Sequence, residues 1–213
     1  RTGLSWNDVL EREGKLGKSL VSSSAPSSWK SQAAGAYDPQ TGKYTSFDSG
    51  GWAAASEQII AYYLDPRNFI NQIGIFQFLT HTYDAETQTS AGLAAVVSGT
   101  FLDAAFPEAG FATYADALME AGRTATVNPY VLASMILVEQ GTSGTGKCIS
   151  GTVSGYEGYY NYYNIGAYKT ASMSAVTRGL WYASRSGSYQ RPWDGHFASL
   201  LGGALFYREN SVK

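Results

Sequence analysis

The segment 141–169 places the strongest limit on how this chain can fold, because it is dense in glycine and tyrosine. Glycine lowers helix stability by roughly 1 kcal/mol at each interior position, so this segment cannot be helical throughout. Apolar residues recur at helical spacing before it, at 129–140, and after it, at 170–184 and 195–208. The sequence therefore predicts a mainly α protein of the α+β class, whose helices are interrupted by one insertion that forms a small β lobe.

Helix boundaries can be recognised at several other points of the chain. A helical pattern over 53–64 ends just before Pro66, because the residue that precedes a proline disfavours the helical conformation. Asn128 followed by Pro129 is typical of a helix start, and Gly141 of a helix end. Further helical or apolar segments are expected at 5–20, 69–80, 90–102 and 111–122.

The N-terminal quarter has a different composition from the rest. Residues 21–51 are rich in serine, glycine, proline and alanine and contain turn signals. Aromatic residues are scattered through the same stretch, which indicates that much of it is pinned to other structure. We expect residues 1–51 to form an N-terminal helix and a wrapping arm, part of the same domain as the main body at 52–213.

Composition excludes several classes of protein. Apolar residues make up 44% of the chain and charged residues 15%, which is incompatible with a disordered protein. The 17 acidic and 15 basic side chains provide no basic field for nucleic acid. No apolar run approaches the roughly 20 residues of a membrane span. The 16 tyrosines and 5 tryptophans suit a wet groove that grips sugar rings or bases.

The sequence indicates neither a metal nor a cofactor. Cys148 is the single cysteine, so no disulfide can form within the chain, and two histidines make a poor inventory for structural zinc. The run 141–148 nearly spells a phosphate-binding loop. Cysteine, however, replaces the hydroxyl residue that would bind Mg²⁺, and no helix pattern follows. We expect no cofactor and no metal site.

Glu139 is the most informative residue of the chain. It follows Leu132, Met135 and Ile136 at helical spacing, so it continues an apolar stripe, and it lies in the last turn, where the helix dipole is negative. Both placements disfavour a charged carboxylate. A glutamic acid that stays partly protonated near neutral pH is what glycosidic cleavage requires. The alternative is an ordinary surface glutamate at a fraying helix end.

Two blocks of sequence around this residue resemble those of a known family. The first, 132–141, ends in a helix-end glutamate close to a glycine, and the second, 159–168, contains Tyr163-Asn164-Ile165-Gly166. They resemble the bacterial glucosaminidase domain of glycoside hydrolase family 73, which carries a helix-end Glu followed by Gly and then a Tyr-Asn-x-Phe-Gly-Ile block. Asn164 and Gly166 match that block, whereas its phenylalanine is absent here.

The resemblance extends over about residues 6–207 and is closest to the cell-wall autolysins. The most distinctive stretch is Tyr-Tyr-Leu-Asp-Pro-Arg-Asn-Phe at 62–69, and shorter matches occur at 28–30, 51–52 and 202–204. The resemblance implies a fold similar to goose-type lysozyme, with a helical lobe, a small β lobe and a substrate groove between them. Residues 52–213 would then be the catalytic domain.

The resemblance also implies an activity and a location. The expected activity is that of an endo-β-N-acetylglucosaminidase, which hydrolyses the β-1,4 bond after N-acetylglucosamine in peptidoglycan. The expected partner is the glycan strand, with no nucleic acid and no membrane span, and we expect a monomer. The chain would be secreted to the cell wall, with Arg1 following a signal peptide that has been removed.

The site residues follow from the same resemblance. Glu139 would be the general acid that protonates the glycosidic oxygen. Tyrosine rings can stack on the apolar face of a sugar, although a core of the β lobe is the alternative for some of them. The residues expected to contact substrate are Tyr160, Tyr163, Asn164, Gly166, Tyr168 and Trp193.

The second catalytic group remains open at this point. Most glycosidases pair two carboxyl groups, and Glu157, in the glycine-rich loop, is the first candidate for the partner of Glu139. Asp194 is another, and the 2-acetamido group of the substrate can take the same role.

Two alternative functions use the same residues. A muramidase or a lytic transglycosylase would share the fold and the single glutamate but would break a different bond or release a different product. A cell-wall glycan-binding module without catalysis would keep the aromatic residues but gain little from an acid on an apolar stripe.

Overall fold

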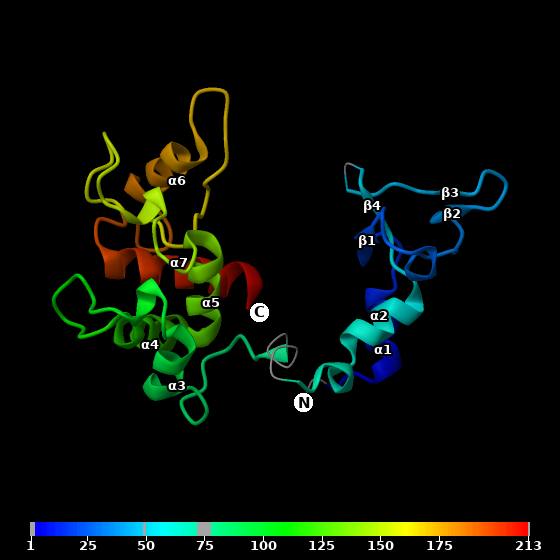
Figure 1. Cartoon of the computed structure of the whole chain (residues 1–213), viewed down its shortest axis with the longest axis horizontal. Coiled ribbons are helices and arrows are strands. Elements are labelled where there is room, and N and C mark those ends of the chain that lie inside the picture. The colour runs from blue at the N-terminus through cyan, green and yellow to red at the C-terminus, as the bar shows by residue number, and fades with distance from the viewer. Residues whose placement is uncertain (1–2, 49, 72–77, 213) are drawn as a thin grey trace. The chain divides into compact units, whose positions relative to one another are not determined.

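The computed structural model describes residues 3–48, 50–71 and 78–212. The chain divides into two compact units, Arg1–Phe78 and Leu79–Lys213, which appear in blue to cyan and in green to red in Figure 1. The expected apolar segment at 69–80 lies partly outside the described residues. No helix in the described ranges is both long and apolar enough to cross a membrane.

The first unit combines short helices with two small antiparallel sheets. β1 pairs with β4, with Val21 opposite Ala53, and β2 pairs with β3 in a hairpin. The elements are α1 (Trp6–Glu13), β1 (Leu20–Ser22), η1 (Ser27–Trp29), β2 (Tyr37–Asp38), β3 (Lys43–Tyr44), β4 (Trp52–Ala54), α2 (Glu57–Leu64) and η2 (Pro66–Phe69).

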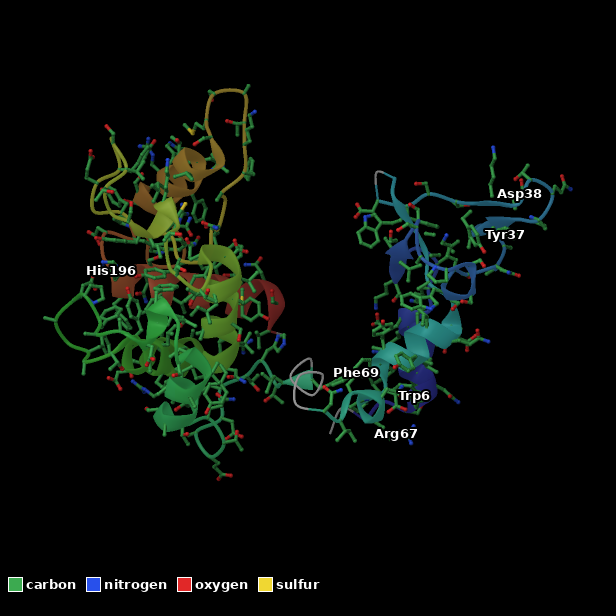
Figure 2. All side chains as sticks on the ribbon, in the orientation of Figure 1. Trp6, Tyr37, Asp38, Arg67, Phe69 and His196 are labelled. Carbon is green, nitrogen blue, oxygen red and sulfur yellow. The ribbon has the colours of Figure 1, made fainter. Side chains whose placement is uncertain are left out.

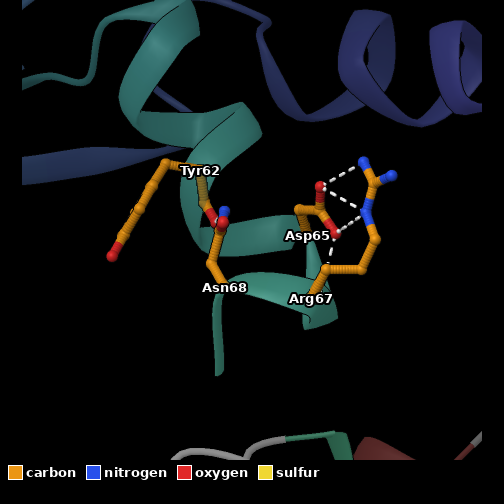
Figure 3. Close-up of polar contacts among 4 residues, drawn as sticks. All are labelled: Tyr62, Asp65, Arg67 and Asn68. Carbon is orange, nitrogen blue, oxygen red and sulfur yellow. Dashed lines mark hydrogen bonds and ion pairs between the residues drawn. The ribbon is translucent and has the colours of Figure 1, made fainter. Parts of the chain in front are cut away.

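Local sequence explains the boundaries of these elements. Ser5 and Asp8 form a capping box at the start of α1. The Asp38 carboxylate accepts hydrogen bonds from the turn that joins β2 to β3. Asp38 is labelled in Figure 2. Asp65 ends α2 ahead of the proline, as predicted, and its carboxylate then pairs with Arg67 at 2.6 Å (Figure 3).

The compact units divide later than the predicted boundary between residues 51 and 52. β4 and α2 lie beyond residue 51, yet both belong to the first unit, and β4 is tied there by its ladder to β1. A strand and its hydrogen-bonded partner must share a compact unit, and composition alone does not show that pairing. The assignment of both parts to a single functional domain stays a prediction.

The second unit is built from helices. α4 packs against α3, α5 and α7, and the fully buried side chains at these contacts include Leu118, Leu132, Ile136 and Leu200. The elements are α3 (Ser90–Val97), η4 (Phe101–Asp103), α4 (Tyr114–Ala125), α5 (Pro129–Gln140), η5 (Lys147–Ile149), α6 (Ala175–Ser184) and α7 (His196–Ser211).

The predicted helices of this unit are confirmed, with shifts at their ends. α5 has the predicted bounds, and α7 runs three residues further than the 208 expected. α4 begins at Tyr114 rather than 111, because Thr113 and Asp116 form a capping box there. The segment predicted at 90–102 is helical only to Val97, and a 3₁₀ turn follows Gly99.

The predicted β lobe is wrong. Over the described residues 141–174, the segment forms turns and one 3₁₀ helix and contains no β-strand. Glycines such as Gly151, Gly155 and Gly158 adopt positive φ, which favours successive turns over a ladder. Tyr162 and Tyr163 anchor the segment in the helical core instead. The mainly α class is confirmed, and the strands belong to the first unit.

Candidate active site

Glu139 lies at the C-terminal end of α5, which is fixed at both ends. The Asn128 side chain accepts from the Tyr130 backbone N–H at 2.9 Å, and Pro129 occupies the first helical position. Gly141 ends the helix with φ 72° and ψ 162°, a conformation that a side chain would strain. The position of Glu139 is therefore set by strong local signals.

The expected burial of Glu139 on the apolar stripe is wrong. Leu132 and Ile136 are buried, but the next residue of that face is Gln140, which is 5% exposed, and Glu139 is exposed. The reason is the helical period of 3.6 residues: Gln140 lies four residues after Ile136, whereas Glu139 is rotated by about 100° toward solvent. The carboxylate is thus accessible to a ligand.

Asn164 forms hydrogen bonds with Glu139, although the two residues are 25 positions apart in the chain. The Asn164 Nδ2 group donates to the Glu139 carboxylate at 2.9 Å and to its backbone carbonyl at 3.2 Å. Asn164 has φ 49°, a left-handed conformation that asparagine tolerates better than most residues. The two residues that the sequence blocks paired are therefore in contact in the structure.

A layer of buried amides supports this contact. Gln140 Nε2 donates to the Tyr162 carbonyl at 2.8 Å and to Asn164 Oδ1 at 3.2 Å. Asn161, wholly buried, donates to the carbonyls of Ile165 at 2.9 Å and Gly179 at 3.0 Å, which ties the loop to α6. Sequence reasoning missed both residues, although a polar residue next to Glu139 and an asparagine within the tyrosine run were visible signals.

Tyr163 does not line a groove. It is 6% exposed, its hydroxyl donates to the Leu200 carbonyl at 3.3 Å, and burial raises the pKa of Tyr163. Its ring lies against Gly203 of α7, where an added Cβ would come within 2.0 Å of the ring. The predicted sugar contact of Tyr163 is therefore wrong for this structure, since its ring is part of the core.

Trp193 is likewise a core residue. Its exposed fraction is 0%, and its Nε1 group donates to the Tyr189 carbonyl at 2.8 Å. The ring lies over Gly202, where a Cβ would approach Nε1 to 1.9 Å. A ring buried in this way has no face left for a sugar, so the predicted contact is corrected to a packing role.

Tyr168 and Tyr160 remain available to a ligand to different degrees. Tyr168 is 56% exposed, and the Arg178 guanidinium lies over its ring, 4.9 Å from the centroid, and donates to its hydroxyl. Tyr160 is half-buried and its ring packs against His196, with ring centroids 3.9 Å apart and the planes tilted by 34°. Their sugar contacts stay predictions.

Gly166 has a structural role that does not require substrate. Its φ of 70° is left-handed, and an added Cβ would lie 3.2 Å from the Tyr182 ring. A glycine is therefore needed for the loop to turn beside α6. A contact between its backbone and a sugar stays a prediction.

A second polar network, absent from the sequence predictions, lies at the start of α7. The Glu108 carboxylate accepts from the backbone N–H groups of His196 and Phe197 and so caps a helix whose N-cap, Gly195, has no side chain. His196, labelled in Figure 2, contacts the Tyr162 hydroxyl through Nδ1 at 2.6 Å. Burial lowers the pKa of His196, and the charge of Glu108 partly opposes this.

The two candidates for a second carboxylate are both exposed. The Glu157 carboxylate accepts from the Gly155 backbone N–H at 3.0 Å, within its own loop. Asp194 lies just before α7. Neither is hydrogen-bonded to Glu139 in the described ranges, so their catalytic roles stay predictions. The same ranges contain no cluster of histidine, cysteine, aspartate or glutamate suited to hold a metal ion.

Cys148 should be unreactive in the folded protein. It is 3% exposed, and burial, with a smaller contribution from the charge of Glu139, raises its pKa to about 11 from an ordinary 9.0. At pH 8 its thiolate fraction is then about 100-fold below that of an ordinary thiol. We expect alkylation by iodoacetamide at pH 8 to be at least about 100-fold slower in buffer than in 8 M urea. Equal rates would contradict the burial of this thiol.

The chain is similar in sequence to a protein of known name. The chain is 29% identical over 157 residues to a Bacillus subtilis (strain 168) protein named β-N-acetylglucosaminidase. The match covers 73% of this chain but 16% of that relative, so the chain spans a small part of the relative's length. No protein-family model matches the sequence.

Solved structures are similar over most of the chain. A crystal structure of a major bifunctional autolysin has a TM-score of 0.53 at 20% identity, with 96% of this chain and 69% of that chain covered. S. aureus glucosaminidase B has a TM-score of 0.48 at 24% identity, with 80% and 64% covered. The autolysin likeness confirms a mainly α fold of the lysozyme-like class. The predicted resemblance to a glucosaminidase domain is therefore confirmed: the chain is similar in sequence to a protein named β-N-acetylglucosaminidase and in fold to an autolysin.

Proposed function

We propose that this chain is an endo-β-N-acetylglucosaminidase that hydrolyses the β-1,4 bond between N-acetylglucosamine and N-acetylmuramic acid in peptidoglycan. The observation that carries the proposal is the exposed Glu139 carboxylate, to which Asn164 donates at 2.9 Å at the C-terminal end of α5. The sequence similarity to a protein named β-N-acetylglucosaminidase supports the same substrate. A module that only bound glycan would not need an acid fixed in this way.

Glu139 acts as the general acid in this proposal. Its Oε2 accepts from Asn164, and in the described part of the chain no protein group hydrogen-bonds Oε1. The proton of the acid form therefore sits on Oε1 and passes to the glycosidic oxygen as the bond from that oxygen to C1 breaks. Water adds its hydroxyl to C1 and releases its other proton, which replaces the proton given up by Glu139, and the product ends in a reducing N-acetylglucosamine.

The proposed substrate determines where the protein acts. Its partner is the glycan strand of peptidoglycan, so the protein is secreted and acts at the cell wall. The proposal also includes a monomeric state. The fold likeness to an autolysin supports a cell-wall substrate. Tyr168, which is exposed, and Tyr160, which is half-buried, are the predicted side chains that would stack on sugar rings.

The products of digestion test the proposal. Purified peptidoglycan is incubated with the wild-type chain, and the soluble fragments are reduced with borohydride and analysed by mass spectrometry. Reduced N-acetylglucosamine ends are expected. Reduced N-acetylmuramic acid ends would show a muramidase, and anhydromuramyl ends would show a lytic transglycosylase. Binding to the walls without any fragment would show a binding module, and each of these three results would overturn the proposal.

Glu157→Gln tests the identity of the second catalytic group. If Glu157 supplies the second carboxylate, its amide form should lower turnover by at least about 100-fold, the lower bound for a general acid–base group. The measurement is kcat on wall fragments, with Asp194→Asn as the matched variant. Near-wild-type turnover for Glu157→Gln would remove Glu157 from the mechanism and leave Asp194 or the substrate acetamido group.

A further inference from the structure

Gln140 occupies an unusual place for a polar residue. It is 5% exposed on the face of α5 that otherwise carries Leu132, Ala133 and Ile136 into the core. A buried amide is costly unless its hydrogen-bonding groups are satisfied. Gln140, the immediate neighbour of Glu139, therefore needs hydrogen-bond partners of its own. Those partners determine the role of Gln140.

The orientation of the Gln140 amide is fixed by backbone carbonyls. Its Nε2 group faces the carbonyl oxygens of Tyr162 at 2.8 Å and Asn161 at 3.4 Å. Both partners are obligate acceptors, so the group that faces them must be the NH₂ and cannot be the amide oxygen. The side chain is also closely packed, because a Cβ added to Gly146 would lie 1.9 Å from Gln140 Oε1. Gln140 therefore has a single stable orientation.

That orientation determines the orientation of Asn164. The same Nε2 group lies 3.2 Å from Asn164 Oδ1, so the oxygen of the Asn164 amide must face Gln140. Its Nδ2 group must then face the opposite side, where it donates to Glu139 Oε2 at 2.9 Å. If Asn164 rotated by half a turn, two oxygens would face each other at Glu139, and two NH₂ groups would face each other at Gln140.

We propose that Gln140 is a positioning residue that holds the NH₂ of Asn164 toward the Glu139 carboxylate. This inference rests on the proposed function, in which Glu139 gives up a proton. The carboxylate that develops in the transition state is stabilised by the Asn164 donor, because hydrogen bonding to the charged form favours that form. Gln140 does not touch the substrate and acts through Asn164.

Gln140→Met tests the inference, since methionine has a similar length and lacks the donor. We expect kcat to fall about tenfold, as for the loss of one hydrogen bond to a charged group, while KM stays within about twofold. Gln140→Glu, which keeps the shape and loses the NH₂, is the second variant if methionine prevents folding.

A double-mutant cycle separates positioning from simple destabilisation. In an Asn164→Ala background, Gln140→Met should cause no further loss of kcat, because the group through which it acts is already gone. A structural role would instead add the same loss in both backgrounds. Circular dichroism confirms that each variant is folded at the assay temperature.

The outcomes distinguish a failure of the positioning role of Gln140 from a failure of the proposed glucosaminidase activity. Wild-type kcat in folded Gln140→Met, or an additive cycle, would overturn the positioning role and leave the glucosaminidase intact. A wild-type chain that releases no fragments from peptidoglycan would overturn the proposed function itself.

Discussion

Glu139→Gln is expected to slow the release of reducing ends from peptidoglycan, with a fall in kcat of about 10³-fold. Glutamine retains the length of the side chain and an oxygen that can accept from Asn164 Nδ2, so the contact at 2.9 Å is preserved. What it removes is the ionisable proton on the second oxygen. The measurement is the initial rate of fragment release, followed by mass spectrometry of the borohydride-reduced products.

A matched control is available on another helix. Glu209 is exposed near the end of α7, and its substitution by glutamine removes one surface carboxylate without approaching Glu139 in sequence or in the described contacts. Glu209→Gln should retain wild-type kcat. The free energies of unfolding of Glu139→Gln and Glu209→Gln should both lie within about 0.5 kcal/mol of the wild-type value. Substantial residual turnover in Glu139→Gln would mean that the acid is another residue, and the mechanism proposed for α5 would fail.

Local signals explain why the helix that carries Glu139 was predictable. Asn128 caps it, Pro129 occupies its first position, and Gly141 ends it in a left-handed conformation. Each of these signals depends only on neighbouring residues and on the backbone they favour. The prediction of which residue lies on the buried face of α5 was less accurate. Glu139 was placed there instead of Gln140, and one residue along a helix corresponds to a rotation of about 100°.

Whether the tyrosines of segment 159–168 are buried or exposed depends on contacts that the sequence does not reveal. Tyr162 and Tyr163 were compatible with a β-lobe core or with a sugar-binding wall. In the structure they enter the helical core because Ser199, Leu200 and Gly203 of α7, 37 to 40 residues later, provide hydrogen bonds and space. Single-sequence patterns report local periodicity and cannot locate such partners.

The contact between Glu139 and Asn164 was predictable only through the resemblance. The two residues are 25 positions apart, and no periodic pattern joins them. The buried amides of Gln140 and Asn161 carried a weaker signal, namely polar residues within otherwise apolar or aromatic stretches. A buried amide requires specific partners, so such positions are worth testing in any glycine-rich loop beside a helix end.

Trp193→Ala is expected to lower the free energy of unfolding by about 3–5 kcal/mol, as for other fully buried tryptophans. The substitution leaves a cavity over Gly202 and removes the hydrogen bond from Nε1 to the Tyr189 carbonyl. Urea unfolding followed by circular dichroism measures the effect without relying on tryptophan fluorescence. Trp193→Phe, which retains most of the ring volume, should cost less than the alanine variant.

The same residue distinguishes packing from sugar binding. Trp6→Ala is the matched control, because the same side chain is removed where it is 44% exposed, and its effect on stability should stay within about 0.5 kcal/mol. At a temperature where Trp193→Ala is still folded, KM for wall fragments should equal that of wild type. A raised KM with unchanged stability would place Trp193 at the substrate, contrary to its burial beneath α7. A loss of stability with unchanged KM would confirm that Trp193 is a packing residue, whose ring lies against Gly202 of α7 and Tyr182 of α6.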